Sequence, residues 1–533
     1  MSEMNHLNNT PNPESLNTPP TWQQRMEQLK QEKALEAAKY FHQIGVSSIV
    51  YAIICTLCLY KSLKGITNPI FTISTVLYMC HIGKVLRKNI RGIHYFCMGA
   101  IVLLGFSNFM TDNNLIIFYN YLAIFGLFLI TLMLLFFDFS EINLFGHFRF
   151  MIDYGFGILE VVLIPISHLF KTIQGYKKMK SERSKYIMLG ILISIPCFFV
   201  MWEILASADV MFNHFFNFKW VFSSNIIYDI VGIILTFLVA FTIPYASFYK
   251  LDHLPQENIK SIRKEYTPII PIIVAGSISV LYIAFSLIQI IFLFMHAGTL
   301  PEGYTYAQYA REGFFQLLFV SALNGLAILI CMELFKKHIA LKALLLIISG
   351  CTFIMIASSA MRMSLYISTY GLTSLRIFVL WGLLVIFLLM LGLLYRMFAK
   401  NFNLFNYALL VSVFCYLLLS FSHYDYWIAD YNFKRYEYFK EQKAMESSEE
   451  DEYTEDSRYV DYDYFMELSE DAAPVLGKHL SELTDYIDKN GYETDEINWY
   501  PYDEDDSRWN IFTFRTFNLS EFYAKKTIPQ NLH

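Results

Sequence analysis

The stretch "YTYAQYAREGFFQLLFVSALNGLAILI", residues 304–330, ends as apolar as a lipid-facing helix but begins with Arg311 beside Glu312. About 20 apolar residues are needed for a helix to cross the roughly 30 Å hydrocarbon core of a bilayer. Charged side chains are costly inside that core and are tolerated near its surface. The stretch therefore predicts a membrane helix whose first turns lie at the membrane surface.

Similar apolar runs recur along most of the 533-residue chain, which is 55% hydrophobic and only 17% charged. We predict an all-α polytopic integral membrane protein with about eleven transmembrane helices. Two shorter apolar segments, 158–170 and 210–222, are expected to lie in the interface or to re-enter the membrane. The predicted spans lie near 44–62, 66–83, 93–111, 115–137, 186–206, 225–248, 268–295, 311–334, 343–361, 377–395 and 405–422.

The basic residues predict the orientation of these spans. Of the Lys and Arg residues in residues 1–422, 24 fall in the N-terminal tail and alternate loops, and 6 fall on the other side. Loops rich in Lys and Arg stay in the cytoplasm, so we expect a cytoplasmic N-terminus. An odd number of crossings then places the C-terminus outside, where residues 423–533 hold 11 basic and 27 acidic residues.

This pattern divides the chain into three parts. We predict a disordered tail and an amphipathic helix in the cytoplasm for residues 1–43, and the transmembrane bundle for residues 44–422. Residues 423–533 predict a small, acidic, mainly helical extracytoplasmic domain. A Glu- and Ser-rich insertion near 441–458 is expected to be mobile, and the run 509–517 to form a strand.

Ionisable residues of the spans fall at one predicted depth, near the outer surface. At 100° per residue, Glu312, Gln316 and Asn324 share one sector of a helix, so they predict a polar stripe facing the bundle interior. Arg362 and Tyr366 share a face in the same way. The residues at this depth are Glu203, Asp209, Asp229, Arg311, Glu312, Arg362 and Arg376.

A tight helical hairpin is predicted between the ninth and tenth spans. Gly371 suits a C-terminal cap with positive φ, and Thr373 can cap the next helix. We hypothesise that the arginines meet the carboxylates in an outward-facing vestibule that binds a ligand. Ion pairs that only fix the packing of helices remain an equally open alternative. The candidate ligand-binding residues are Arg311, Glu312, Gln316, Arg362, Tyr366, Arg376, Glu203, Asp209 and Asp229.

No motif assigns a catalytic residue, a metal or a cofactor. The chain contains no Walker loop, GxGxxG turn, HExxH motif or GxSxG elbow, and its histidines are scattered singly. The basic loop at 168–185 is expected to contact anionic lipid headgroups on the inner side. Nucleic-acid binding is not expected, because the basic residues lack interleaved aromatic residues.

Five separated stretches resemble a family of bacterial integral membrane proteins known as domain of unknown function, numbers 4153 and 4173. The resemblance covers roughly residues 185–525 and implies a bacterial cell (inner) membrane protein with no established activity. It supplies no catalytic residues. The stretches are "LASADVMF" (205–212), "YAREGFFQLLFVSALN" (309–324), "SSAMRMSLYISTYGLTSLR" (358–376), "WIADYNFKRY" (427–436) and "VDYDYFMELSEDAAPVL" (460–476).

Three classes of function remain open. A sensory or scaffolding envelope protein would use the outer domain and the vestibule to bind a ligand or an envelope protein partner. A transporter of a lipid or small solute would need ionisable groups deep in the spans, where the sequence is mostly neutral. An envelope transferase could use Glu312 or Glu203 as a base. We rank the sensor or scaffold first, the transporter second and the enzyme last.

Overall fold

The computed structural model describes nine stretches of the chain and four single positions between them. All of these are helices or the connections between helices, and the described residues contain no strand. The described residues are 22–137, 144–176, 224–254, 266–291, 313–399, 401–445, 461–490, 497–499 and 515–528, with Gly190, Ser194, Phe198 and Met201.

Eight helices of the described part are long and apolar enough to cross a membrane, and the number rises to ten if two bent helix pairs each count as one span. The predicted all-helical membrane architecture is therefore confirmed, but the count of eleven is not. The predicted span 186–206 lies almost wholly outside the described residues, as does the segment 210–222. The segment 158–170 belongs to one bent pair, Gly146–Val161 and Ile164–Thr172.

Two predicted spans form helices that fail the length or hydropathy requirement by themselves. The helix α3 (Thr67–Val85) occupies the predicted span 66–83, but it carries many polar residues, several of them buried. The helix α16 (Leu404–Ser420) occupies 405–422 and is short. It passes only together with α17 (Tyr424–Met445), to which it is bent by 58°.

The chain divides into two compact units. The first contains residues 1–52 and 160–246. It includes α1 (Trp22–Tyr40), the π-helical turn η2 (Phe41–Gly45), the start of α2 (Val46–Leu59), α7 (Ile164–Tyr176) and most of α10 (Ser224–Asp252). An aromatic cluster joins three of these helices, because the Tyr245 hydroxyl lies 2.9 Å from Nδ1 of His168 and the Tyr40 ring lies against both.

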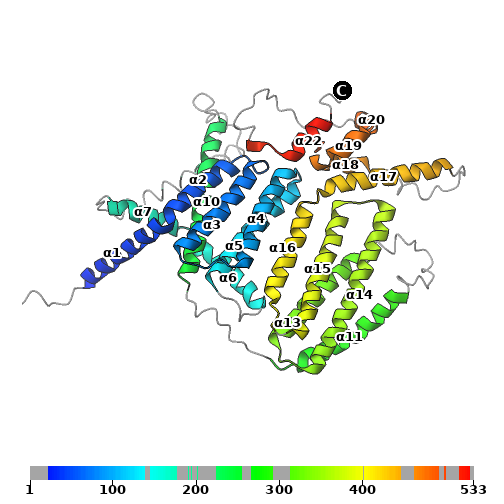
Figure 1. The fold of residues 1–533 in the computed structure, drawn as a ribbon, viewed down its shortest axis with the longest axis horizontal. Helices are drawn as coiled ribbons and strands as arrows, with labels where there is room; N and C mark the ends of the chain where they lie inside the picture. Colours follow the sequence, from blue (N-terminus) through cyan, green and yellow to red (C-terminus); the bar gives the residue numbers. More distant parts are fainter. Residues whose placement is uncertain are drawn as a thin grey trace, which may run out of the picture. The chain divides into compact units, whose positions relative to one another are not determined.

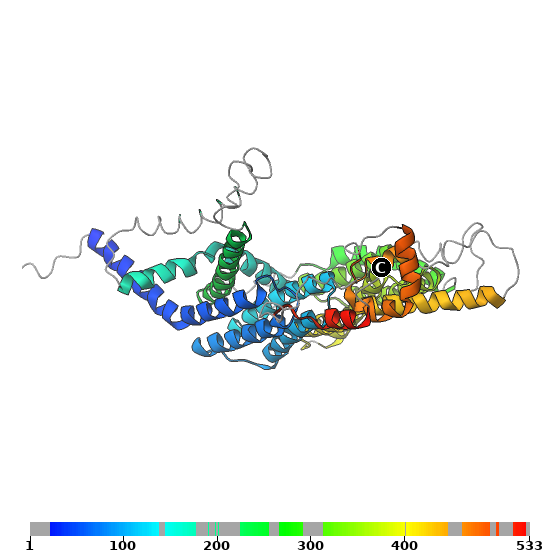
Figure 2. The same cartoon turned by 90° about the horizontal axis from the view of Figure 1, so that it is seen from above.

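The second unit contains residues 53–159 and 247–533. Long helices run side by side in it, and the C-terminal helices lie across one end of them (Figures 1 and 2). The other long helices are α4 (Gly92–Met110), α5 (Asn114–Phe136), α6 (Leu144–Val161), α11 (Ile269–Gln289), α13 (Phe314–Leu334), α14 (Ile339–Tyr370) and α15 (Ser374–Phe398).

The helices α3 and α4 approach closely at Gly105. A Cβ atom at this position would lie 2.1 Å from Oγ1 of Thr72 and 2.9 Å from the carbonyl oxygen of Asn68. One turn further along α4, buried hydroxyl and amide groups join α4, α5 and α16. Oγ of Ser420 lies 2.7 Å from Oγ of Ser107 and 2.8 Å from Oδ1 of Asn120. Small and polar residues at these crossings let apolar helices associate in a defined register.

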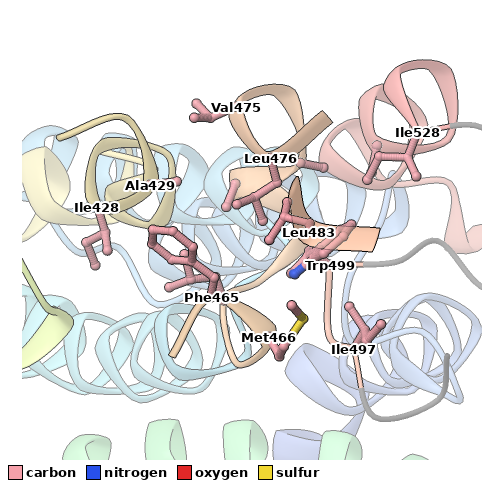
Figure 3. Close-up of a cluster of buried hydrophobic side chains, with 14 of the residues drawn as sticks. Ile428, Ala429, Phe465, Met466, Val475, Leu476, Leu483, Ile497, Trp499 and Ile528 are labelled. Carbon is pink, nitrogen blue, oxygen red and sulfur yellow. The ribbon is translucent and has the colours of Figure 1, made fainter. Parts of the chain in front are cut away.

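The C-terminal helices of the second unit form what we call the cap: the described residues of 461–528. These helices are α18 (Tyr462–Met466), η6 (Glu470–Ala472), α19 (Ala473–Leu476), η7 (Gly477–His479), α20 (Leu480–Asn490) and α22 (Leu519–Thr527). Figure 3 shows Phe465, Leu483 and Ile528 gathered around Trp499, with Ile428 of α17 beside them. Ile116 of α5 and Leu419 of α16 belong to the same buried cluster.

This shared core bears on the predicted extracytoplasmic domain. Residues 423–533 are mainly helical where described, as expected, and they pack on the bundle. A separate domain is not confirmed, because the hydrophobic core of the cap includes side chains of α5, α16 and α17. Most of the predicted strand 509–517 and of the insertion 441–458 lies outside the described residues.

The contact at Gly105 generates a prediction about stability. We expect Gly105→Ala to lower the free energy of unfolding by about 1–3 kcal/mol, because the added methyl group must displace Thr72 or the backbone of α3. Thermal unfolding of the purified full-length protein in detergent measures the effect. Gly99→Ala on the same helix is the matched control, since a Cβ atom there meets nothing within 4 Å. Equal unfolding temperatures for the two variants would contradict the proposed close approach.

Candidate functional site

The connection between α4 and α5 is a short polar turn, Thr111–Asn113, whose three residues are all buried. A turn at the end of two membrane-type helices would ordinarily face water or lipid headgroups. Here the cap and the start of α17 cover it. Its backbone and side chains must therefore find hydrogen-bond partners in the protein.

Asp471 of the cap supplies several of these partners. Its carboxylate accepts hydrogen bonds from the Thr111 hydroxyl at 2.5 Å and from the Asp112 backbone N–H at 3.1 Å. Nδ1 of His423, in the bend between α16 and α17, lies 3.1 Å from the same carboxylate. Asn518 donates its amide to the carbonyl oxygen of Thr111 at 2.9 Å. The cap thus holds the turn through a buried, fully hydrogen-bonded anion.

A second carboxylate, Asp425 at the start of α17, holds the other side of the turn. Its Oδ2 accepts from the Asn113 amide at 2.7 Å and from the backbone N–H of Ser469 at 3.1 Å. The Ser469 hydroxyl donates to the same oxygen at 2.5 Å. Asn113 also caps α5, since its side chain accepts the N–H of Ile116 at 3.0 Å. One buried acid therefore links the bundle to the cap segment that precedes Asp471.

A cavity of about 590 Å³ lies between the turn and the cap. Within it the Lys64 ammonium pairs with the Asp112 carboxylate. Glu470 lines the cavity, is only 9% exposed, and its Oε2 has no hydrogen-bond partner among the described residues. The lining residues are Lys64, Asp112, Asn113, Asn114, Leu115, Ser374, Tyr424, Asp425, Tyr464, Glu467, Leu468, Ser469, Glu470, Ile497, Asn498 and Glu521.

Burial and like charges raise the pKa of two carboxyl groups in this cavity. Loss of hydration, together with the nearby carboxylates of Asp112 and Glu521, raises the pKa of Glu470 to about 8. Loss of hydration also raises the pKa of Asp112 to about 6, although Lys64 acts in the opposite direction. The cavity thus holds more acidic groups than its own cation can neutralise.

In the ion pair of His423 and Asp471, beneath the cavity, both pKa values shift in the direction that favours the charged form. Burial acts to raise the pKa of Asp471, but hydrogen bonds from His423, Ser520 and Thr111 outweigh it and hold that pKa below its ordinary value. The same hydrogen bond raises the pKa of His423 above its ordinary value. The adjacent residues Glu470 and Asp471 therefore differ sharply: one acid is stabilised as an anion and the other is not.

Arg362 and Arg376, the two described arginines of the predicted vestibule, do not line this cavity. Arg362 is buried on α14, where it donates to Oε1 of Gln289 at 3.1 Å, and a Cβ atom on Gly313 would lie 3.2 Å from it. The Arg376 guanidinium lies 4.3 Å from the centre of the Tyr366 ring and donates to the carbonyl oxygen of Tyr370 at 3.0 Å. The structure thus brings Arg376 and Tyr366 together by stacking.

The hairpin that carries these residues forms as predicted, with a difference in its caps. Gly371 ends α14 with φ of +83°, but its ψ of −179° is not that of a left-handed helical cap. Thr373 occupies the N-cap position of α15, but its side chain makes no capping hydrogen bond. Asn432 of α17 holds the loop instead, since its amide exchanges hydrogen bonds with the backbone of Leu372 at 2.7 and 2.9 Å.

The predicted polar stripe is wrong, because it assumed one helix through residues 309–324. Gly313 has a φ of +91°, and α13 begins only at Phe314, so no single helix runs through Gly313. Gln316 is exposed, whereas Asn324 is buried and donates to the Thr352 hydroxyl at 3.0 Å. The two amides thus have different surroundings.

The remaining predicted site residues are divided between the two units or lie outside the described residues. Asp229 lies on α10 in the first unit, whereas Arg362 and Arg376 belong to the second. The expected cluster therefore stays a prediction. Four of its members lie outside the described residues: Glu203, Asp209, Arg311 and Glu312.

The sequence analysis missed the residues that form the cavity. The signal for them is weak: "TDNN" at 111–114 is a polar turn between two predicted spans, and "SED" at 469–471 resembles any acidic surface segment. Nothing in either stretch indicates that the other covers it. Among the described residues, no group of three or more His, Cys, Asp or Glu side chains is arranged to hold a metal ion.

The shifted acids predict a pH dependence. Glu470 and Asp112 bind protons more tightly in the folded protein than in the unfolded chain, and so does His423, so stability falls as the pH rises. The lowered pKa of Asp471 acts oppositely, but its contribution to stability is lost only as the pH falls below the ordinary pKa of an aspartic acid. For Glu470 the stability is lost between its ordinary pKa of 4.5 and its pKa of about 8 in the folded protein. This difference corresponds to on the order of 5 kcal/mol.

We therefore expect the detergent-solubilised full-length protein to unfold at a lower temperature at pH 8.5 than at pH 5.5. Glu470→Gln removes the largest titrating group and should flatten this dependence, while raising the unfolding temperature at pH 8.5. Asp485→Asn, which changes an exposed carboxylate of α20, is the charge-matched control. A pH dependence as steep in Glu470→Gln as in the control would refute this assignment.

Comparison with known proteins gives one match. A model of the family described as Domain of unknown function (DUF4153) matches residues 98–479, which include the turn, α17 and the cap residues through His479. No match was found among the curated proteins or among the solved structures. Because the match spans most of the chain and includes both buried acids that bind the turn, the chain belongs to the DUF4153 family.

Proposed function

We propose that this protein is a multi-pass membrane receptor of the sensory or scaffolding class, whose cap encloses a ligand pocket on one face of the helical bundle. The observation that carries the proposal is Glu470, a nearly buried carboxyl group that lines a cavity of about 590 Å³ and whose Oε2 has no hydrogen-bond partner in the part of the chain that the structure describes. Burial of such a group destabilises the protein unless a ligand donates a hydrogen bond to it.

The position of the cavity supports coupling between ligand and cap. The turn Thr111–Asn113 contributes Asp112 and Asn113 to the lining, and the same turn binds Asp471 and Asp425. A ligand in the cavity therefore contacts both sides of the cap–bundle contact. Binding to the docked state alone stabilises that state by mass action. A receptor or scaffold can report occupancy in this way without transferring a solute.

Deuterium exchange of residues 461–479 in the full-length protein tests this function. Two probes are compared: nanodiscs of total bacterial polar lipids, against nanodiscs of synthetic phosphatidylcholine, and the low-molecular-mass fraction of a bacterial extract. We expect at least one probe to slow exchange several-fold in the wild type and in Asp485→Asn, but not in Glu470→Gln. If neither probe slows exchange, the cap does not report a ligand and the proposal falls.

We also propose that the cap lies outside the cytoplasm of a bacterial cell. The ends of the second unit's bundle opposite the cap carry clustered cations. These are Lys84 in the last turn of α3, Arg87, Lys88 and Arg91 between α3 and α4, and Lys336 and Lys337 before α14. Such loops stay on the cytoplasmic side. The mostly acidic cap is on the other side of the bundle.

A C-terminal reporter measures this orientation directly. Alkaline phosphatase fused after His533 should be active, because it folds only outside the cytoplasm, and green fluorescent protein at the same position should be dark. Fusions after Lys88 are the control and should give the reverse result. Fluorescence from the C-terminal fusion would show that the cap is cytoplasmic.

A further inference from the structure

The cavity beneath the cap continues into an apolar groove. A second hollow of about 840 Å³ shares Lys64, Asn114 and Glu521 with the cavity. Its other lining side chains include Leu63 and, along α5, Phe118, Leu122 and Phe125. These apolar residues are exposed on the protein surface.

The groove follows a helix that is long and apolar enough to cross a membrane. Phe118, Leu122 and Phe125 are spaced by four and three residues, so they share one face of α5. From Phe118 to Phe125 they extend about 10 Å along the helix, at 1.5 Å per residue. A groove with this direction is occupied by acyl chains when α5 lies in a bilayer. A polar pocket and an apolar groove thus meet at Lys64.

The charges at this junction are arranged in order. Lys61 lines the groove, Lys64 and Glu521 line both hollows, and Glu470 lines the cavity alone. Asp112 accepts a hydrogen bond from the Lys64 ammonium, which has three donors and so retains capacity for an anion. From groove to cavity the order is apolar, cationic and acidic. A zwitterionic phospholipid has the complementary order of acyl chain, phosphate and ammonium.

The unpartnered oxygen of Glu470 restricts the kind of ammonium. Glu470 is 91% buried, with 9% of its surface exposed, and Oε2 accepts no hydrogen bond among the described residues. A primary ammonium can donate to this oxygen, whereas a quaternary ammonium has no N–H group. An anionic headgroup without an amine has no ammonium to donate to this oxygen, and the carboxylates of Glu521 and Asp112 would repel it.

We propose that the groove and the cavity together bind one phospholipid with a primary-amine headgroup, of the phosphatidylethanolamine type. Its acyl chain lies along Phe118, Leu122 and Phe125, its phosphate contacts Lys64, and its ammonium donates to Glu470. This inference rests on the ligand pocket proposed above and names the class of ligand. Glu521, whose Oε1 lies 3.4 Å from the Lys525 ammonium, forms the other acidic wall.

Binding of defined lipids to the delipidated full-length protein in detergent tests the proposal. Dioleoyl phosphatidylethanolamine and dioleoyl phosphatidylcholine differ only in the methylation of the amine, and dioleoyl phosphatidylglycerol lacks the amine. Native mass spectrometry gives the affinity for each. We expect at least tenfold tighter binding of the ethanolamine lipid than of either other lipid, since one hydrogen bond to a charged group is lost with the others.

Two pairs of variants test the headgroup and the chain separately. Glu470→Gln should reduce the preference for the ethanolamine lipid at least tenfold, while Asp485→Asn should keep it. Leu122→Trp should weaken the binding of all three lipids several-fold by filling the groove, while Leu103→Trp, on an exposed face of α4 outside the groove, should not. Glu521→Gln replaces Glu470→Gln if that variant does not fold.

The outcomes separate this inference from the pocket itself. Equal binding of the ethanolamine and choline lipids by the wild type overturns the inference, as does an unchanged preference in Glu470→Gln. Free ethanolamine serves as a soluble probe of the cavity. If it raises the unfolding temperature in a Glu470-dependent manner while the lipids are not distinguished, the lipid assignment is wrong and the ligand pocket stands.

Discussion

Two buried carboxylates, Asp471 and Asp425, hold the C-terminal cap on the helical bundle. Each accepts at least three hydrogen bonds, and the donors come from the bundle, the cap and the bend before α17. An anion buried in this way is stable only while all of its donors are in place. These hydrogen bonds define the position of the cap more precisely than apolar contact alone would. If the cap moved, charged oxygens and backbone N–H groups would lose their hydrogen-bond partners together.

The neighbouring residue shows the opposite condition. Glu470 follows Ser469 and precedes Asp471, and its backbone position is dictated by the hydrogen bonds of both. Its side chain is thereby held in the cavity, where no described residue gives Oε2 a hydrogen bond. Groups that destabilise a fold persist where function needs them, and they are held there by well-satisfied surroundings. We regard the pair Glu470–Asp471 as a combined anchor and binding group.

Much of the helical architecture could be predicted from the sequence, since long apolar runs between polar turns specify membrane-type helices by length alone. The runs at 93–111 and 115–137 became α4 and α5 almost residue for residue. The run 66–83 shows where this reasoning is weak. It forms a helix, but Thr72 and Asn68 serve contacts with α4 and lower its hydropathy. Polar residues used for packing cannot be told from those that face water without the partner helix.

The candidate site could not be predicted in the same way. Its residues come from turns and caps separated by up to about 450 positions, as with Lys64 and Glu521, which line the same cavity. Helical periodicity relates residues within one element only. It placed Arg362 and Tyr366 on one face of α14, but it gave no means of finding that Asp471 binds Thr111. The acidic composition of the tail also concealed which few carboxylates are buried.

The bend between α16 and α17 has a consequence for the proposed receptor. α17 turns by 58° at His423, which has a φ of +45°, and exposes Trp427, Tyr431 and Tyr438. Such aromatic side chains favour the boundary between hydrocarbon and water. In the proposed orientation, α17 lies at that boundary and α16 lies in the lipid beside it. A change in bilayer thickness would then change the angle between α16 and α17 at His423, which contacts Asp471, the acid that binds the cap to the bundle.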